Sequence, residues 1–168
     1  MDNFLPSGYT ALSTSNYFKF KDGANTFRVL SSAIVGFEYW NTANKPVRSA
    51  EAFKTTPPDI RLDKDGNPTK IKHFWCFTVW SYDDNRVQIM EITQASIREA
   101  IKALVDNAKW GDPHNYDLTI TRSGEGLDTS YQVMPNPHSE LDPKIKEEYE
   151  SRVIRLEALF DGEDPFVA

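Results

Sequence analysis

The chain has a single cysteine, Cys76, so its 168 residues form no internal disulfide bond. No apolar run approaches the roughly 20 residues that a helix needs to cross a bilayer. The first ten residues have neither the basic nor the apolar region of a signal peptide, so we expect no secretion signal. A chain of this length can bury a core as one domain without a disulfide or a metal.

Basic residues are fewer than acidic ones, with 19 Lys and Arg against 25 Asp and Glu and a net charge of −6. Residues 136–168 hold 4 basic and 9 acidic residues, hence −5, which leaves −1 for residues 1–135. The acidic total argues against strong nonspecific binding of nucleic acid through bulk charge. It does not exclude a local basic groove, because the field at a surface depends on how the charges are arranged.

Alternating and β-branched residues predict a mainly β fold with two helices. Ile97, Ile101 and Leu104 are spaced for a helix over 94–108. The order of the body is three strands, this helix and two strands, which predicts a five-stranded Greek-key barrel of the OB-fold type. An open α+β sheet is the alternative, and order alone does not separate the two. The five strands of the body are expected at 26–40 with a bend near Ser31-Ser32, 71–82, 86–92, 116–121 and 129–134, and a further alternating strand at 17–21 precedes them.

The same patterns divide the chain into four parts. Residues 1–16 are expected to be an extended arm, 17–137 the barrel domain, 138–160 a C-terminal amphipathic helix and 161–168 an acidic tail. Asp142-Pro143 is a typical helix start. Apolar residues then recur at helical spacing and predict a helix from 144 to 160: Ile145, Tyr149, Val153, Leu156 and Phe160.

One face of the strongest predicted strand, 71–82, combines a cation with aromatic rings. Lys72, Phe74, Trp80 and Tyr82 alternate along it, and Arg86 on the next strand is expected to extend that face. Single-stranded nucleic acid binds to such a mixture, because rings stack on bases and cations hold phosphates. The other interpretation is that these aromatic side chains pack under the helix or the N-terminal arm.

The connection between the first two strands of the body is locally basic. Residues 45–72 hold seven basic and four acidic residues, a net charge of +3. In an OB-fold this loop and the loop between strands four and five, here 122–128, flank the binding groove. Lys45, Arg48 and Arg122 are therefore candidate phosphate contacts, and a solvated loop with ordinary charges is the alternative.

The sequence gives little support for catalysis or for a metal site. His73 and Cys76 lack a second pair of ligands to complete a tetrahedral zinc site. We expect no catalytic residue, no metal and no cofactor. Two alternatives stay open: a protein-interaction module that uses the β face, and a metal-dependent nuclease. The nuclease would use acidic residues, several of which turn chemistry already explains: Asp83, Asp84, Asp117, Glu125 and Asp128.

Motifs spread over residues 4–137 together resemble one known family. They include Phe4-Leu5-Pro6 with Tyr9, Lys45-Pro46-Val47-Arg48, and the stretches VWSYDDNRVQIMEITQASI and WGDPHNYDLTITRSGEGLDTSYQV. In these motifs the chain is similar to bacteriophage and prophage single-stranded DNA-binding proteins of the OB-fold group. The resemblance implies a role in DNA replication or recombination in the cytoplasm of a bacterial host. It favours Lys45, Arg48, Trp80 and Tyr82 as contacts to single-stranded DNA.

The tail resembles the acidic tip of bacterial single-strand binding proteins, although Val167-Ala168 follow its Pro165-Phe166. The resemblance implies that Asp161, Glu163, Asp164 and Phe166 dock replication or recombination proteins. An ordinary frayed terminus is the alternative. The sequence as a whole therefore predicts a non-catalytic protein that binds single-stranded DNA with little sequence preference.

Overall fold

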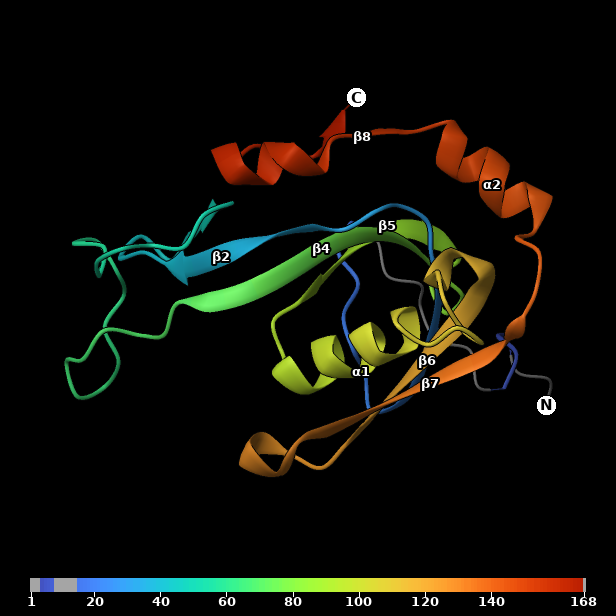
Figure 1. Ribbon diagram of the computed structural model, residues 1–168, viewed down its shortest axis with the longest axis horizontal. Coiled ribbons are helices and arrows are strands. Elements are labelled where there is room, and N and C mark those ends of the chain that lie inside the picture. Colours follow the sequence, from blue (N-terminus) through green and yellow to red (C-terminus); the bar gives the residue numbers. More distant parts are fainter. Residues whose placement is uncertain (1–3, 8–14, 168) are drawn as a thin grey trace.

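In the computed structural model, which describes residues 4–7 and 15–167, one seven-stranded antiparallel sheet forms the body (Figure 1). Its strands follow the order β3-β2-β4-β1-β6-β7, and β5 joins by pairing with β4. Within these residues no helix is long and apolar enough to cross a membrane. The strands of the sheet are β1 (Gly23–Val29), β2 (Ile34–Trp40), β3 (Pro46–Ser49), β4 (Lys72–Ser81), β5 (Arg86–Ile92), β6 (Tyr116–Ser123) and β7 (Ser130–His138).

Helices and two short strands complete the structure. The α-helices are α1 (Ala95–Val105) and α2 (Pro143–Glu150). The 3-10 helices are η1 (Pro113–Asn115), η2 (Gly126–Asp128) and η3 (Leu156–Asp161). The strands β8 (Val153–Ile154) and β9 (Phe166–Val167) pair only with each other.

β1 and β2 are the two halves of the long first strand that the sequence predicts, and the chain bends between them at the expected serines. Ser31 Oγ accepts a hydrogen bond from the Thr78 N–H at 2.8 Å, which keeps the bend attached to β4. β3 lies inside the expected loop, where Pro46 suggested a break. The proline begins an edge strand, and there its missing N–H costs little pairing.

The two faces of the sheet have different covers. On the side that we call the helix face, Ile97 and Ile101 of α1 pack on Phe27, Val79 and other buried apolar side chains. The register pairs Gly36 with Phe74 and Cys76 with Glu91, so these residues share the opposite side, the outer face. Figure 1 shows α1 on one side of β4 and β5 and the C-terminal elements on the other.

Residues 141–167, which we call the C-terminal segment, cross the outer face. The predicted single helix over 144–160 is wrong, because α2 ends at Glu150. The β-branched pair Val153-Ile154 then forms β8 with β9, and the Arg155 N–H donates to the Pro165 carbonyl at 2.8 Å. The apolar residues that suggested a helix remain mostly inward, but along a folded-back chain.

The mainly β class is confirmed, whereas the sheet is not a closed barrel. Among the described residues β5 and β7 form no ladder with each other. The edge of β5 instead binds residues 16–18, where Ile89 exchanges backbone hydrogen bonds of 2.8 Å with Asn16 and Phe18. The expected strand at 17–21 is therefore a single parallel bridge at Tyr17, and most of the expected arm, residues 1–16, lies outside the described residues.

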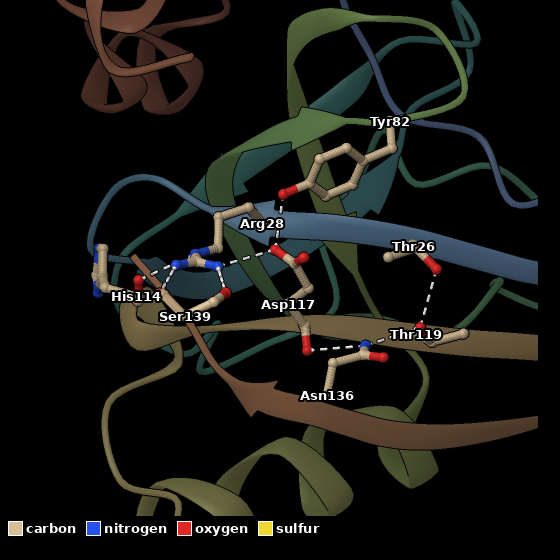
Figure 2. A network of polar contacts seen from close by, with 8 residues as sticks. All are labelled: Thr26, Arg28, Tyr82, His114, Asp117, Thr119, Asn136 and Ser139. Carbon is tan, nitrogen blue, oxygen red and sulfur yellow. Dashed lines mark hydrogen bonds and ion pairs between the residues drawn. The ribbon is translucent and has the colours of Figure 1, made fainter. Parts of the chain in front are cut away.

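One buried arginine joins β1 and β6 to the chain that leaves β7 (Figure 2). Arg28 on β1 is 2% exposed and donates to the His114 carbonyl at 3.1 Å and to Asp117 Oδ1 at 3.0 Å. It also donates to the hydroxyl and the carbonyl of Ser139, just after β7. Asp117 accepts a further hydrogen bond of 2.8 Å from the Tyr82 hydroxyl. A single guanidinium thus connects β1, β6 and the exit from β7.

Replacing Arg28 by Met should destabilise the fold strongly. The substitution leaves Asp117 and the Ser139 carbonyl without their buried partner, and breaking a buried ion pair costs about 3–5 kcal/mol. Urea unfolding of Arg28→Met and of the wild type measures this difference. Lys102→Met is the control, because Lys102 belongs to an exposed i,i+4 pair that contributes about 0.3–0.5 kcal/mol. Equal losses in the two variants would show that the Arg28 network does not hold the fold.

Candidate nucleic-acid interface

The outer face has three parts, and its first part is polar. This polar part lies on β1, β6 and β7. The hydroxyls of Thr26 on β1 and Thr119 on β6 lie 2.9 Å apart. Asn136 Nδ2 donates to the Asp117 carbonyl at 3.1 Å and to Thr119 Oγ1 at 3.0 Å (Figure 2). Tyr82 borders this part, and burial together with its hydrogen bond to Asp117 raises its pKa to about 12. Its hydroxyl is therefore a neutral donor that holds Asp117.

The middle part, on β4 and β5, is covered. Phe74 is fully buried in one cluster with Ile89, Leu156 and Leu159, so its ring lies under η3. Trp80 is half-buried and packs in a second cluster that contains Ile145 of α2. The packing interpretation therefore describes Phe74 in this structure, but its cover is the C-terminal segment rather than the helix or the arm.

Arg48, expected to hold a phosphate, lies in a buried cluster of charges. Its Nε is 3.1 Å from Glu38 Oε2, and its Nη2 is 2.9 Å from Glu91 Oε2. The side chains of Arg48 and Glu38 are only 9% and 6% exposed. Burial, aided by the hydrogen bond and charge of Glu91, raises the pKa of Glu38 to about 8. Two carboxylates share one guanidinium, so Arg48 is engaged while this cluster is intact.

The third part of the outer face is open and lies where β2 ends and β3 begins. Trp40 is 36% exposed, and the Arg61 guanidinium lies over its ring at 5.8 Å from the centroid. The loop that carries Arg61 is fixed there, because the Arg61 N–H donates to the Trp40 carbonyl at 2.8 Å. In the register of β2 and β4, Lys72 lies opposite Glu38 and so shares the face of Trp40. Lys45 directly precedes β3, and the side chains of both lysines are exposed.

Trp40 and Arg61 were not among the residues that the sequence singles out as a site. They are 21 positions apart, and only the folding of the 41–70 loop back onto the end of β2 stacks them. The available signal was the alternation of Glu38 and Trp40 next to a loop with a positive net charge.

Two of the expected cations point away from the outer face. Trp80 pairs with Val87, so Arg86 lies on the opposite side of β5 and donates to Asn16 Oδ1 at 2.7 Å. The expectation that Arg86 extends the face of Trp80 is wrong by one residue of register. Arg122 alternates with Thr121 on β6 and lies toward the helix face, with its Nε 3.9 Å from Asp22 Oδ1.

The predicted tail residues meet predicted DNA contacts in one cavity. Lys45, Arg48, Glu163 and Asp164 all line a cavity of about 520 Å³ beside η3. Asp161 is exposed, whereas Phe166 is half-buried in β9 against the cluster that contains Phe74. The structure therefore places the acidic tail on the outer face of its own chain.

The acidic residues of the nuclease alternative are dispersed. Asp117 is held by Arg28 and Tyr82, and Asp83 pairs with Lys21 at 3.0 Å. Asp84 accepts a hydrogen bond of 3.0 Å from Gln88. In residues 4–7 and 15–167 no three His, Cys, Asp or Glu side chains are grouped as metal ligands would be.

Comparison with known proteins finds a similar protein from a bacteriophage. The chain is 28% identical over 138 residues to a protein of Escherichia phage T5 named "Probable ssDNA-binding protein". The match covers 70% of this chain and 53% of the phage T5 protein, so the chain spans about half the length of that relative. No family model and no solved structure matches. The predicted resemblance to phage single-stranded DNA-binding proteins is confirmed.

The buried carboxylate of Glu38 should make stability fall as pH rises. Its folded pKa of about 8 lies above the ordinary value of 4.5, so the folded chain binds the extra proton between these values. Each pKa unit corresponds to about 1.4 kcal/mol, and the wild type should lose up to a few kcal/mol from pH 5 to pH 8. Unfolding of Glu38→Gln should lack this loss, while the exposed control Glu99→Gln should keep it. Parallel curves for wild type and Glu38→Gln would contradict the assignment.

Proposed function

We propose that the chain binds single-stranded DNA with little sequence preference and that the open part of the outer face makes the first contact. The observation that carries this proposal is the exposed Trp40 under Arg61, with Lys45 and Lys72 beside it. An indole ring stacks on any base, and nearby cations hold the phosphates on either side. The relative from phage T5, named as a probable ssDNA-binding protein, supports the same chemistry.

We also propose that the sheet is an opened form of the OB-fold barrel. The bent pair β1 and β2 would be its first strand, β4 and β5 its second and third, and β6 and β7 its fourth and fifth, with α1 in between. The pairings of β4 with β1, β2 and β5, and of β6 with β1 and β7, support this reading. OB-folds bind oligonucleotides on the face of the second and third strands, which here is the covered part.

The role that follows is the binding and protection of single strands during phage DNA replication or recombination in the host cytoplasm. The exposed Asp161, Glu163 and Asp164 remain candidates for docking partner proteins. Phe166 could join them only after leaving its place beside the Phe74 cluster. A protein without catalysis would leave an oligonucleotide intact when Mg²⁺ is present.

Replacing Trp40 by Ala should weaken binding to oligo-dT by about 1–3 kcal/mol, because one stacked base loses its platform. This is roughly 5- to 150-fold in Kd, measured by fluorescence anisotropy of a labelled oligonucleotide. Leu127→Ala, an exposed apolar residue in the turn before β7, is the control and should bind normally. Unchanged affinity of Trp40→Ala would remove the open part from the site. Cleavage of the oligonucleotide in the presence of Mg²⁺ would favour the alternative of a metal-dependent nuclease. A chain that binds no oligonucleotide at low salt would favour the alternative of a protein-interaction module.

The lysines should set the salt dependence of this binding. Single-stranded DNA gives a slope of about −0.7 in log affinity against log salt for each neutralised phosphate. Lys45→Ala with Lys72→Ala should therefore make the slope about 1.4 less steep than in the wild type. Lys102→Ala with Lys109→Ala, two exposed lysines at α1 on the helix face, provides the matched control. If both pairs change the slope equally, the lysines act only through net charge.

A further inference from the structure

The C-terminal segment is bonded to itself rather than to the sheet. Among the described residues, the hydrogen bonds and ion pairs of residues 142–167 stay inside the segment. Examples are the Lys144 N–H to Asp142 Oδ1, at 2.9 Å, and the Arg155 N–H to the Pro165 carbonyl, at 2.8 Å. Moving the segment off the sheet would break none of them.

Apolar side chains hold the segment on the outer face. Leu156 and Leu159, 8% and 3% exposed, pack in one cluster with Phe74 and Ile89. A Cβ at Gly36 would clash with the Ser49 carbonyl oxygen and lie 3.2 Å from the Phe160 ring, so glycine is required there first by the close approach of β3, and it also leaves space for Phe160. At the other end of the segment, Ile145, Tyr149 and Ile154 pack in the cluster that contains Trp80.

Aromatic and acidic side chains of the segment lie where the bases and phosphates of a nucleic-acid strand would lie on the outer face. Phe160 lies against Phe74 with ring centroids 6.2 Å apart and ring planes tilted by 46°, so an aromatic side chain of the segment covers the ring that a base would need as its platform. Arg48 lies over the same Phe74 ring at 5.9 Å. Glu163 and Asp164 line the cavity that Lys45 also lines, so their carboxylates lie where a phosphate held by Lys45 would lie.

We propose that the C-terminal segment is a displaceable cover and that single-stranded DNA, bound first at the open part, extends over Phe74 and Trp80 by displacing it. This inference rests on the proposed function and adds a closed and an open state of the same site. A closed cover lowers the apparent affinity by the fraction of molecules that are open. Because the contact is apolar, screening by salt leaves this fraction nearly unchanged.

The first test uses the unmodified full chain and hydrogen exchange read by mass spectrometry. Addition of oligo-dT should raise the exchange rate of amides in 156–160 by about tenfold or more, because a six-residue 3-10 helix does not keep its hydrogen bonds formed once its apolar side chains have left the sheet. Amides of β2 near Trp40 should become slower in the same sample. Unchanged or stronger protection of η3 in the DNA complex would overturn the proposal.

The second test loosens the cover in the full chain. Leu159→Ala should bind oligo-dT more tightly than the wild type, by up to about tenfold, because the closed state loses buried contact. Val153→Ala is the matched control, since Val153 is in the same segment and 56% exposed, and it should bind as the wild type does. The ratio of the Leu159→Ala and wild-type affinities should be the same at about 50 and 200 mM salt. A ratio that falls to one at the higher salt would show that charge, not apolar contact, holds the cover.

The outcomes separate the two proposals. If oligo-dT does not bind at all, both the proposed function and the proposal of a displaceable cover are overturned. If oligo-dT binds and Trp40→Ala weakens binding, but η3 stays protected and Leu159→Ala binds as the wild type, only the cover is overturned. A Leu159→Ala chain that fails to fold leaves the exchange experiment on the wild type as the deciding measurement.

Discussion

The structure depends on a central strand that is apolar on both of its faces. In β4 the alternation places Phe77 and Val79 on the helix face and Phe74 and Cys76 on the outer face, and all four are buried. Such a strand needs a cover on each side, because an exposed apolar patch of this kind is unfavourable in water. α1 covers one side and the C-terminal segment the other. The composition of β4 therefore requires an occupant on its outer face, and in this structure the C-terminal segment is that occupant.

Local patterns in the sequence predicted the strands and the helix whose positions depend on contacts between residues close together in the chain. The alternation in β4, β5, β6 and β7 and the helical spacing of Ile97 and Ile101 predicted strands and a helix at nearly the observed positions. The prediction for Arg86 failed because a shift of one residue in a hairpin moves every side chain to the other face. The β4–β5 turn includes Asn85 with a positive φ of 51°, and the pairing that follows it could not be read from alternation alone.

Contacts between distant parts of the chain account for the rest. Val153 fits the predicted helical stripe, but the pairing of Val153 and Ile154 with Val167 and Phe166 makes this part of the chain a strand. Phe74 and Arg48 were expected to face DNA because nothing near them in the sequence shows that η3 covers one and that Glu38 and Glu91 hold the other. The choice of face was nevertheless useful, since the residues picked on β4 do share the outer face with Trp40.

If the chain binds DNA as proposed, the charge cluster of Arg48, Glu38 and Glu91 limits what Arg48 can contribute to that binding. With Glu38 and Glu91 both ionised, the cluster has a net charge of −1 and repels a phosphate, whereas one protonated carboxyl makes it neutral. The raised pKa of Glu38 keeps the second condition below pH 8. Opening the cover would admit water and lower that pKa, because burial is its main cause. Under the proposed function, attraction at this end of the outer face would therefore come from Lys45, Arg61 and Lys72, whereas the ion pairs of Arg48 connect β2, β3 and β5.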